Sequence, residues 1–176
     1  MTKSKFLCLL AGLVSAILVC CASPPDTVRD YNSAVRLIAE QRYDVAETIL
    51  TQLVQDHPGD HEAWNQLGLL AFRDERWNEA ERCFRRAVRL VPTHLVYRRN
   101  LALALAEQNQ LIAAREIIEQ LVEADPSNVR YHIDLAQLLW MLDQPREARD
   151  ELAEARKLAP ENREAQLLER AWSAPR

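Results

Sequence analysis

Four prolines recur along the chain at a fixed interval of 34 residues, at Pro58, Pro92, Pro126 and Pro160. A self-similar period of this length indicates similar supersecondary units stacked side by side, each completing the core of its neighbour. Because proline cannot continue an α-helix, each of the four prolines marks the end of one unit. The sequence therefore divides into four units of equal length, residues 27–60, 61–94, 95–128 and 129–162.

Small and large apolar residues occupy equivalent positions in the four units. The second unit shows the pattern most fully, with Trp64, Leu67, Gly68, Ala80, Phe84 and Ala87. Gly68 in a helix interior costs about 1 kcal/mol relative to alanine, so we expect a neighbouring backbone to need the space. The chain has only 3 glycines, and most of its 8 prolines fall between periodic segments or at the chain ends. This distribution favours an all-helical chain over a β-sandwich or a doubly wound sheet.

The spacings Trp64-x2-Leu67-Gly68, Ala80-x3-Phe84, Ala87 and Pro92 resemble the tetratricopeptide repeat. The resemblance implies an all-α, right-handed α-solenoid of four helix pairs. Its concave face, made mainly by the first helix of each pair, would bind a protein or peptide partner. Residues 163–176 follow the last repeat, and Ala165, Leu168 and Trp172 predict a C-terminal capping helix there. The alternative role of Trp172 is self-association of the chain into a homo-oligomer.

Polar residues at the unit boundaries predict where helices begin. Asp60, Asn128 and Asn162 close three units, and each can accept hydrogen bonds from the first N–H groups of the helix that follows. We expect Asp44 and Asn78 to cap the second helices of the first two units in the same way.

The resemblance also implies a set of partner-binding residues. In the tetratricopeptide family, the second, fifth, sixth, ninth, twelfth and thirteenth positions of each repeat line the concave groove. Transferred to this chain, the predicted groove includes Tyr31, Asn32, Val35, Asn65, Gln66, Leu69, Phe72, Arg73, Arg99, Asn100, Leu103, Asp134, Gln137 and Trp140.

Two rows of these groove residues suggest how a partner is held. The sixth positions form a polar row that we expect to hydrogen-bond an extended peptide, at Asn32, Gln66, Asn100 and Asp134. Beside it, the ninth and twelfth positions are largely apolar and would supply affinity. The alternative is that several of the apolar residues only pack between neighbouring helices. Chaperone-type arrays that clamp a C-terminal carboxylate have basic or amide residues where this chain has Tyr31, Val35, Val96 and Asn100, so we expect no carboxylate clamp.

Residues 1–20 are typical of a secretory signal. Residues 1–5 are basic, and residues 6–19 are uncharged over a length too short for a comfortable membrane span. The following Leu18-Val19-Cys20-Cys21 resembles the lipobox of bacterial lipoproteins, which implies acylation of Cys21, with residues 21–26 as a lipidated cysteine and short linker. The usual small residue before the acylated cysteine is replaced by Cys20, which makes Cys20 an alternative candidate for the acceptor. The same segment is also compatible with ordinary cleavage after Ala22 and with an uncleaved anchor.

These features predict a lipoprotein of the bacterial cell envelope that faces the periplasm. Ala22 after the cysteine resembles a signal for sorting to the outer membrane. Removal of the signal would leave Cys83 as the one unlipidated cysteine, which we interpret as a small, semi-buried apolar residue.

The sequence indicates no catalytic chemistry. The histidines, His57, His61, His94 and His132, form no metal-ligand motif, and nucleophile and phosphate-loop motifs are absent. We therefore expect no enzymatic activity, no cofactor and no metal. The net charge of −4 argues against binding of nucleic acid.

One basic concentration lies in the second unit, at Arg82, Arg85, Arg86 and Arg89. We interpret it as a solvated helix face beside Glu79 and Glu81; the alternative is contact with an acidic protein or with lipid headgroups.

Together the repeats and the signal predict a non-catalytic adaptor that is tethered to the membrane and assembles a protein complex in the envelope. The combination resembles small tetratricopeptide lipoproteins that assist the assembly of pili or secretion systems. Two further functions fit the same features: an adaptor for cell-wall enzymes and a periplasmic chaperone for outer-membrane proteins.

Overall fold

The computed structural model describes residues 31–173, which form helices joined by short turns. The predicted four pairs and final helix are α2 (Tyr31–Ala39) with α3 (Tyr43–Asp56), α4 (His61–Arg73) with α5 (Trp77–Leu90), α6 (Leu95–Glu107) with α7 (Leu111–Ala124), α8 (Val129–Met141) with α9 (Pro145–Leu158), and α10 (Arg163–Ser173). The predicted signal, Cys21 and the predicted linker lie outside the described residues.

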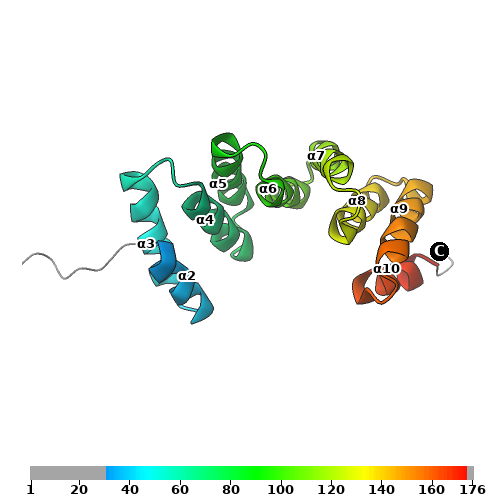
Figure 1. Cartoon of the computed structure of the whole chain (residues 1–176), viewed down its shortest axis with the longest axis horizontal. Helices are drawn as coiled ribbons and strands as arrows, with labels where there is room; N and C mark the ends of the chain where they lie inside the picture. The colour runs from blue at the N-terminus through cyan, green and yellow to red at the C-terminus, as the bar shows by residue number, and fades with distance from the viewer. Residues whose placement is uncertain (1–30, 174–176) are drawn as a thin grey trace, which may run out of the picture.

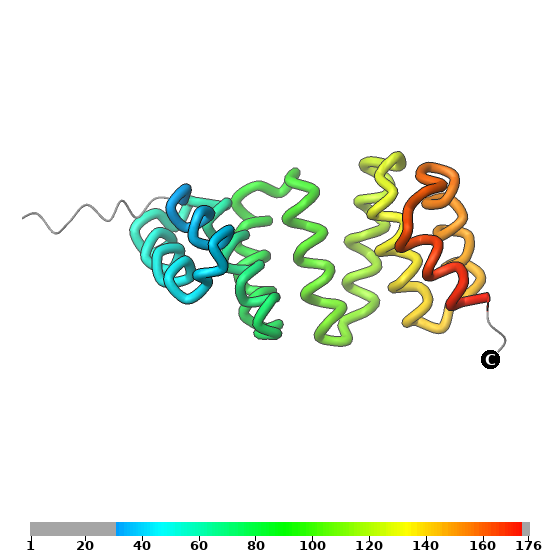
Figure 2. The backbone as a smooth tube through the Cα atoms, turned by 90° about the horizontal axis from the view of Figure 1, so that it is seen from below, coloured from blue at the N-terminus to red at the C-terminus, as the bar shows by residue number. Residues whose placement is uncertain are grey.

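The helix pairs follow one another along a shallow arc. Figure 1 shows α2 and α6 on the inner side of α3 and α7, so the first helices line the concave side. In Figure 2, seen from below, successive pairs stand side by side along the long axis. This is the all-α solenoid that the 34-residue period predicts.

Each first helix ends in the same strained turn. Gln41, Glu75, Asn109 and Asp143 have φ values of 61°, 58°, 60° and 58°, in the left-handed region that favours glycine. The N–H of the following residue donates to the carbonyl five residues back, as from Arg42 to Leu37 at 2.9 Å and from Gln144 to Leu139 at 2.9 Å. This pattern is a Schellman motif, which reverses the chain into the second helix.

Side-chain caps begin three of the helices that follow repeat boundaries, α4, α8 and α10, as the sequence predicts, whereas the side chain of His94 makes no cap hydrogen bond at the start of α6 within the described residues. Asp60 Oδ1 accepts from the Ala63 N–H at 2.9 Å, and Asn162 Oδ1 accepts from the Ala165 N–H at 3.0 Å. Asn128 caps α8 in the same manner through the N–H of the second helical residue. Each cap satisfies an N–H that the first turn of a helix leaves without a helical partner.

The prediction that Asp44 and Asn78 cap the second helices is wrong. α3 begins at Tyr43 and α5 at Trp77, so both residues lie inside the first turn. The N-cap positions are held by Arg42 and Arg76, whose side chains make no cap hydrogen bond in the described structure. The Schellman turn delivers the chain directly into the second helix and fixes this earlier start.

Gly68 makes room for a side chain rather than for the expected backbone. A Cβ added at Gly68 would lie 2.5 Å from Cε1 of Phe84, whose side chain is 1% exposed and cannot move aside freely. The equivalent positions of the other repeats combine alanine with a smaller partner, as Ala34 with Leu50, Ala102 with Ile118, and Ala136 with Leu152. In each repeat, the size of the residue at the Gly68 position is therefore matched to the size of the residue at the Phe84 position.

Within residues 31–173, the buried residues form two clusters instead of one continuous spine. The first cluster joins α2, α3 and α4, and includes Leu70 and Cys83. The second begins with Ala71 and Phe84 and continues to α10. The two clusters meet in the second repeat because adjacent residues of a helix point toward different neighbours.

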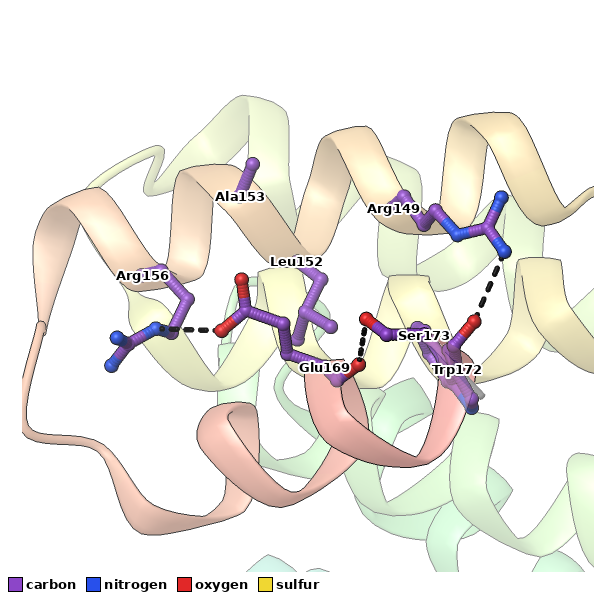
Figure 3. Close-up of a pocket in the computed structure, with 7 residues that line it drawn as sticks. All are labelled: Arg149, Leu152, Ala153, Arg156, Glu169, Trp172 and Ser173. Atoms are coloured by element: carbon purple, nitrogen blue, oxygen red, sulfur yellow. Dashed lines mark hydrogen bonds and ion pairs between the residues drawn. The ribbon is translucent and has the colours of Figure 1, made fainter. Parts of the chain in front are cut away.

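α10 covers the end of the stack, which confirms the predicted capping helix. Trp172 is 8% exposed, and its ring stacks on that of Trp140 with centroids 4.4 Å apart. Figure 3 shows how α10 is held on α9: Arg149 donates to the Trp172 carbonyl at 3.0 Å, and Arg156 pairs with Glu169 at 3.4 Å. The cavity of about 150 Å³ between these residues is lined by side chains that already hold the cap.

Candidate partner-binding groove

Exposed apolar side chains concentrate on the helices that line the concave side. Of the eight large apolar residues that are exposed in the described structure, four occupy groove positions of the repeats, namely Val35, Leu69, Val96 and Met141, and one more, Leu167, lies on α10. Leu167 lies on α10 at the fifth position of a further unit, 34 residues after Ile133. Their exposed fractions range from 38% to 63%. Single exposed apolar residues are ordinary on protein surfaces, but a set shared by one face indicates an interaction surface.

The fifth position of each of the first three repeats bonds to the sixth position of the next. Gln66 donates to the Tyr31 hydroxyl at 3.2 Å, Asn100 Nδ2 donates to Asn65 Oδ1 at 2.9 Å, and Arg99 donates to both Asp134 oxygens at 2.5 and 3.0 Å. We call these three residue pairs, which share four hydrogen bonds, the inter-repeat ladder. The ladder fixes how each first helix sits against the following one.

The ladder changes the role of the polar row that the sequence predicts. Asn65, Asn100 and Asp134 are only 8%, 7% and 3% exposed, because each bonds within the solenoid. Burial raises the pKa of the Asp134 carboxyl, although the bond to Arg99 opposes the shift. Asn32 is exposed and Gln66 is half-buried, so these two of the four side chains in the row retain access to a partner.

Several predicted groove residues also pack inside the chain. The Phe72 ring meets the Trp77 ring edge-on with centroids 4.8 Å apart, and Trp140 is stacked under Trp172. For these two aromatic residues, packing between neighbouring helices is the role that the structure shows. Leu103 and Gln137 are half-buried.

Each groove arginine is paired with a carboxylate of the same chain. Arg73 lies 2.6 Å from Asp74, and its guanidinium lies 3.4 Å above the Tyr43 ring. Arg99 pairs with Asp134, and Arg130 pairs with Asp134 and with Glu164. The groove therefore offers apolar surface and neutralised cations rather than a free positive charge.

A histidine–tyrosine cluster, which the sequence patterns did not reveal, lies between the second and third repeats. The Tyr97 hydroxyl is 2.9 Å from His61 Nδ1, and the Tyr97 ring stacks on His94 with centroids 3.7 Å apart. Burial raises the pKa of Tyr97. His61 and Tyr97 are 36 positions apart, which is close to the length of one repeat and is the one signal that could have suggested the contact.

The remaining candidate residues have structural roles. Cys83 is 7% exposed, and burial raises the pKa of its thiol to about 11, in agreement with its interpretation as a buried apolar residue. In the basic concentration, Arg85 pairs with Glu81 at 2.6 Å and Arg86 donates to the Pro58 carbonyl.

Residues 31–173 contain no group of three or more histidine, cysteine, aspartate or glutamate side chains placed to hold a metal ion. None of the helices in this range has the length and apolarity of a membrane span.

Comparisons with known proteins agree with this architecture. Two family models described as tetratricopeptide repeat match residues 59–127 and 105–171. The N-terminal acetyltransferase A complex auxiliary subunit NAA15 of Arabidopsis thaliana is 35% identical over 68 residues, which are 39% of this chain and only 8% of that protein.

Two solved structures illustrate the similarity of fold. MamA from Desulfovibrio magneticus RS-1 superposes with a TM-score of 0.70 at 20% identity, over 76% of this chain and 75% of that one. PilF of Pseudomonas aeruginosa superposes with a TM-score of 0.67 at 20% identity, over 80% of this chain and 64% of that one. At this level of identity the likeness concerns the fold alone.

Proposed function

Because this chain belongs to the tetratricopeptide repeat family, we propose that it is a non-catalytic adaptor whose concave groove binds a protein partner. Repeats of this kind stack into extended concave surfaces that serve as scaffolds for protein–protein interaction. The complex that it helps to assemble is, in this proposal, an envelope machine such as a pilus or a secretion system.

The observation that carries the proposal is the placement of exposed apolar side chains. Val35 and Leu69 occupy the same position of successive repeats and are 38% and 39% exposed. Neither belongs to a buried cluster or to the partly buried residues that pack against one. Apolar surface that is kept in water on one face of a monomer favours association with another protein.

The proposal includes a lipid tether at Cys21. Its support is the uncharged segment at residues 6–19 followed by the lipobox-like cysteine pair. Residues 22–26 separate Cys21 from the first repeat, and five extended residues reach at most about 17 Å. A tether of that length would hold the groove close to the periplasmic side of the outer membrane.

One set of variants tests both parts in the bacterium that encodes the protein. The tagged full chain is labelled metabolically with a clickable fatty acid, crosslinked and purified with its partners. Leu69→Glu should keep the lipid label and lose the partners, since it places a charge among apolar contacts. Cys21→Ser should lose the label.

Two matched variants serve as controls. Val45→Glu alters an exposed apolar residue on α3, outside the groove, and should keep label and partners; Cys20→Ser should keep the label. If Leu69→Glu and Val45→Glu recover equal amounts of the partners, partner binding in the groove is contradicted. If Cys21→Ser retains the lipid label, acylation of Cys21 is contradicted. Co-purified cell-wall hydrolases, instead of pilus or secretion components, would contradict the assembly role.

A further inference from the structure

We infer that the groove selects a partner segment that combines apolar side chains with lysine or arginine, rather than an acidic segment or a free C-terminal carboxylate. This inference rests on the proposed function, because it concerns the same groove. It follows from a comparison of the charged side chains of the groove. The arginines pair with carboxylates of the same chain, whereas two carboxylates have no cation partner among the described residues.

Each arginine of the groove already pairs with a carboxylate of the same chain. Arg99 donates two hydrogen bonds to Asp134, a carboxylate that is only 3% exposed. Arg130 lies 3.6 Å from the same carboxylate and also pairs with Glu164 on α10. Arg73 is held by Asp74 and by the Tyr43 ring. An acidic partner would have to compete with Asp74 and Glu164 for the surface arginines Arg73 and Arg130, and breaking the buried Arg99–Asp134 pair is strongly unfavourable.

Two carboxylates of the groove are available to a cation of a partner. Glu62 lies in the first turn of α4 and Glu107 is the last residue of α6; both are exposed, and neither has a cation partner among the described residues. They occupy the second and thirteenth positions of their repeats, at opposite ends of the first helices. Glu107 also adds its charge to the negative end of the α6 dipole, where an acidic side chain is unfavourable unless a cation compensates it.

Exposed apolar residues accompany both carboxylates. Val96 holds the position of Glu62 in the next repeat and is 51% exposed. Met141 holds the position of Glu107 in the next repeat and is 57% exposed. Each edge of the groove therefore presents a carboxylate followed, one repeat later, by apolar surface. At either edge, a partner with a basic residue near an apolar one could pair the basic residue with the carboxylate and pack the apolar residue on the exposed apolar side chain.

The test selects ligands without assuming their sequence. The full lipidated chain in detergent micelles is offered a phage library of random 12-residue peptides, after counter-selection on empty micelles. Enriched peptides should combine apolar residues with lysine or arginine. Glu62→Gln/Glu107→Gln should lose the basic enrichment and keep the apolar one, whereas the control Glu116→Gln/Glu123→Gln, which changes two exposed carboxylates of α7, should keep both.

Synthetic peptides then give the size of the effect by fluorescence anisotropy. Replacing the basic residues of an enriched peptide by glutamate should weaken binding by about threefold to tenfold, as expected for a few solvated charge contacts. Amidation of the C-terminus should change nothing. Enrichment of acidic peptides, dependence on a free carboxylate, or unchanged basic enrichment with Glu62→Gln/Glu107→Gln would overturn this inference alone. Failure to enrich any peptide would count against the proposed groove itself.

Discussion

Gln41, Glu75, Asn109 and Asp143 hold the same left-handed conformation in the four repeats, although none of them is glycine. For most L-residues this conformation costs about 1–2 kcal/mol, and asparagine and aspartate tolerate it better. The hydrogen bonds of the Schellman motif offset this strain, because they end each first helix and lead the chain into the second. The sequence patterns could not locate these turns, because the glycine that usually marks them is absent.

Replacing Glu75 by glycine should stabilise the protein. Glycine removes the Cβ strain at a φ of 58° but enlarges the entropy of the unfolded chain. We expect a net gain of about 0.5–1 kcal/mol in the free energy of unfolding, measured by urea denaturation. Asn109→Gly, at a residue that tolerates this conformation, should gain less. An unchanged or lower stability for Glu75→Gly would show that the turn is not strained.

The pairing of Gly68 with Phe84 gives a second prediction at this scale. Gly68→Ala should lower the free energy of unfolding by about 1–2 kcal/mol, since overpacking against the buried ring exceeds the gain in helix propensity. Phe84→Leu reproduces the alanine–leucine combination of the first and fourth repeats, and should therefore recover stability in the Gly68→Ala background. Strictly additive effects of the two substitutions in urea denaturation would contradict the proposed size matching.

Between elements, His132 joins the start of α8 to the preceding turn and to α9. Its Nδ1 lies 2.8 Å from a carboxylate oxygen of Glu151, and its Nε2 lies 2.9 Å from the Pro126 carbonyl oxygen. Both neighbours are acceptors, so both ring nitrogens donate only when the imidazole is protonated. Burial lowers the pKa of His132, but the bonds to Pro126 and Glu151 outweigh burial, and the pKa is raised above 6.5.

This contact should make stability depend on pH. A raised pKa in the folded state means that the contribution of His132 is fully present below pH 6.5 and is lost as the pH rises through the folded-state pKa. His132→Gln should therefore lower Tm most at mildly acidic pH, with the difference from the unaltered protein shrinking toward alkaline pH. His57→Gln, at an exposed histidine in a loop, is the control. A difference that is constant or grows with pH would contradict the protonated pairing.

The elements themselves could be predicted from the sequence more fully than the contacts between them. The period of the prolines predicted the helix pairs. The starts of three helices were predicted from their capping residues, Asp60, Asn128 and Asn162. The ladder could not be predicted, because the period places Asn65 and Asn100 at adjacent positions of successive repeats without showing whether their side chains face a partner or each other. That choice depends on the tilt between neighbouring helices, which the pattern of residues does not contain.

At the scale of the whole molecule, a capped solenoid leaves one curved face available for a partner. The sequence predicted a concave face and placed Val35 and Leu69 among the residues that line it, and in the structure these two side chains are 38% and 39% exposed. It did not predict the withdrawal of Asn100 and Asp134 into the ladder.

Site-specific photocrosslinking in cells tests most directly whether the concave face is the binding face. A photoreactive phenylalanine analogue is placed at Val35 or Leu69 on the first helices, and at Val45 or Ile112, which are 43% and 60% exposed on α3 and α7. We predict that illumination gives a defined protein adduct from the two concave positions and none from the two on second helices. Adducts of equal yield from both sets, or from Val45 and Ile112 alone, would contradict binding in the groove.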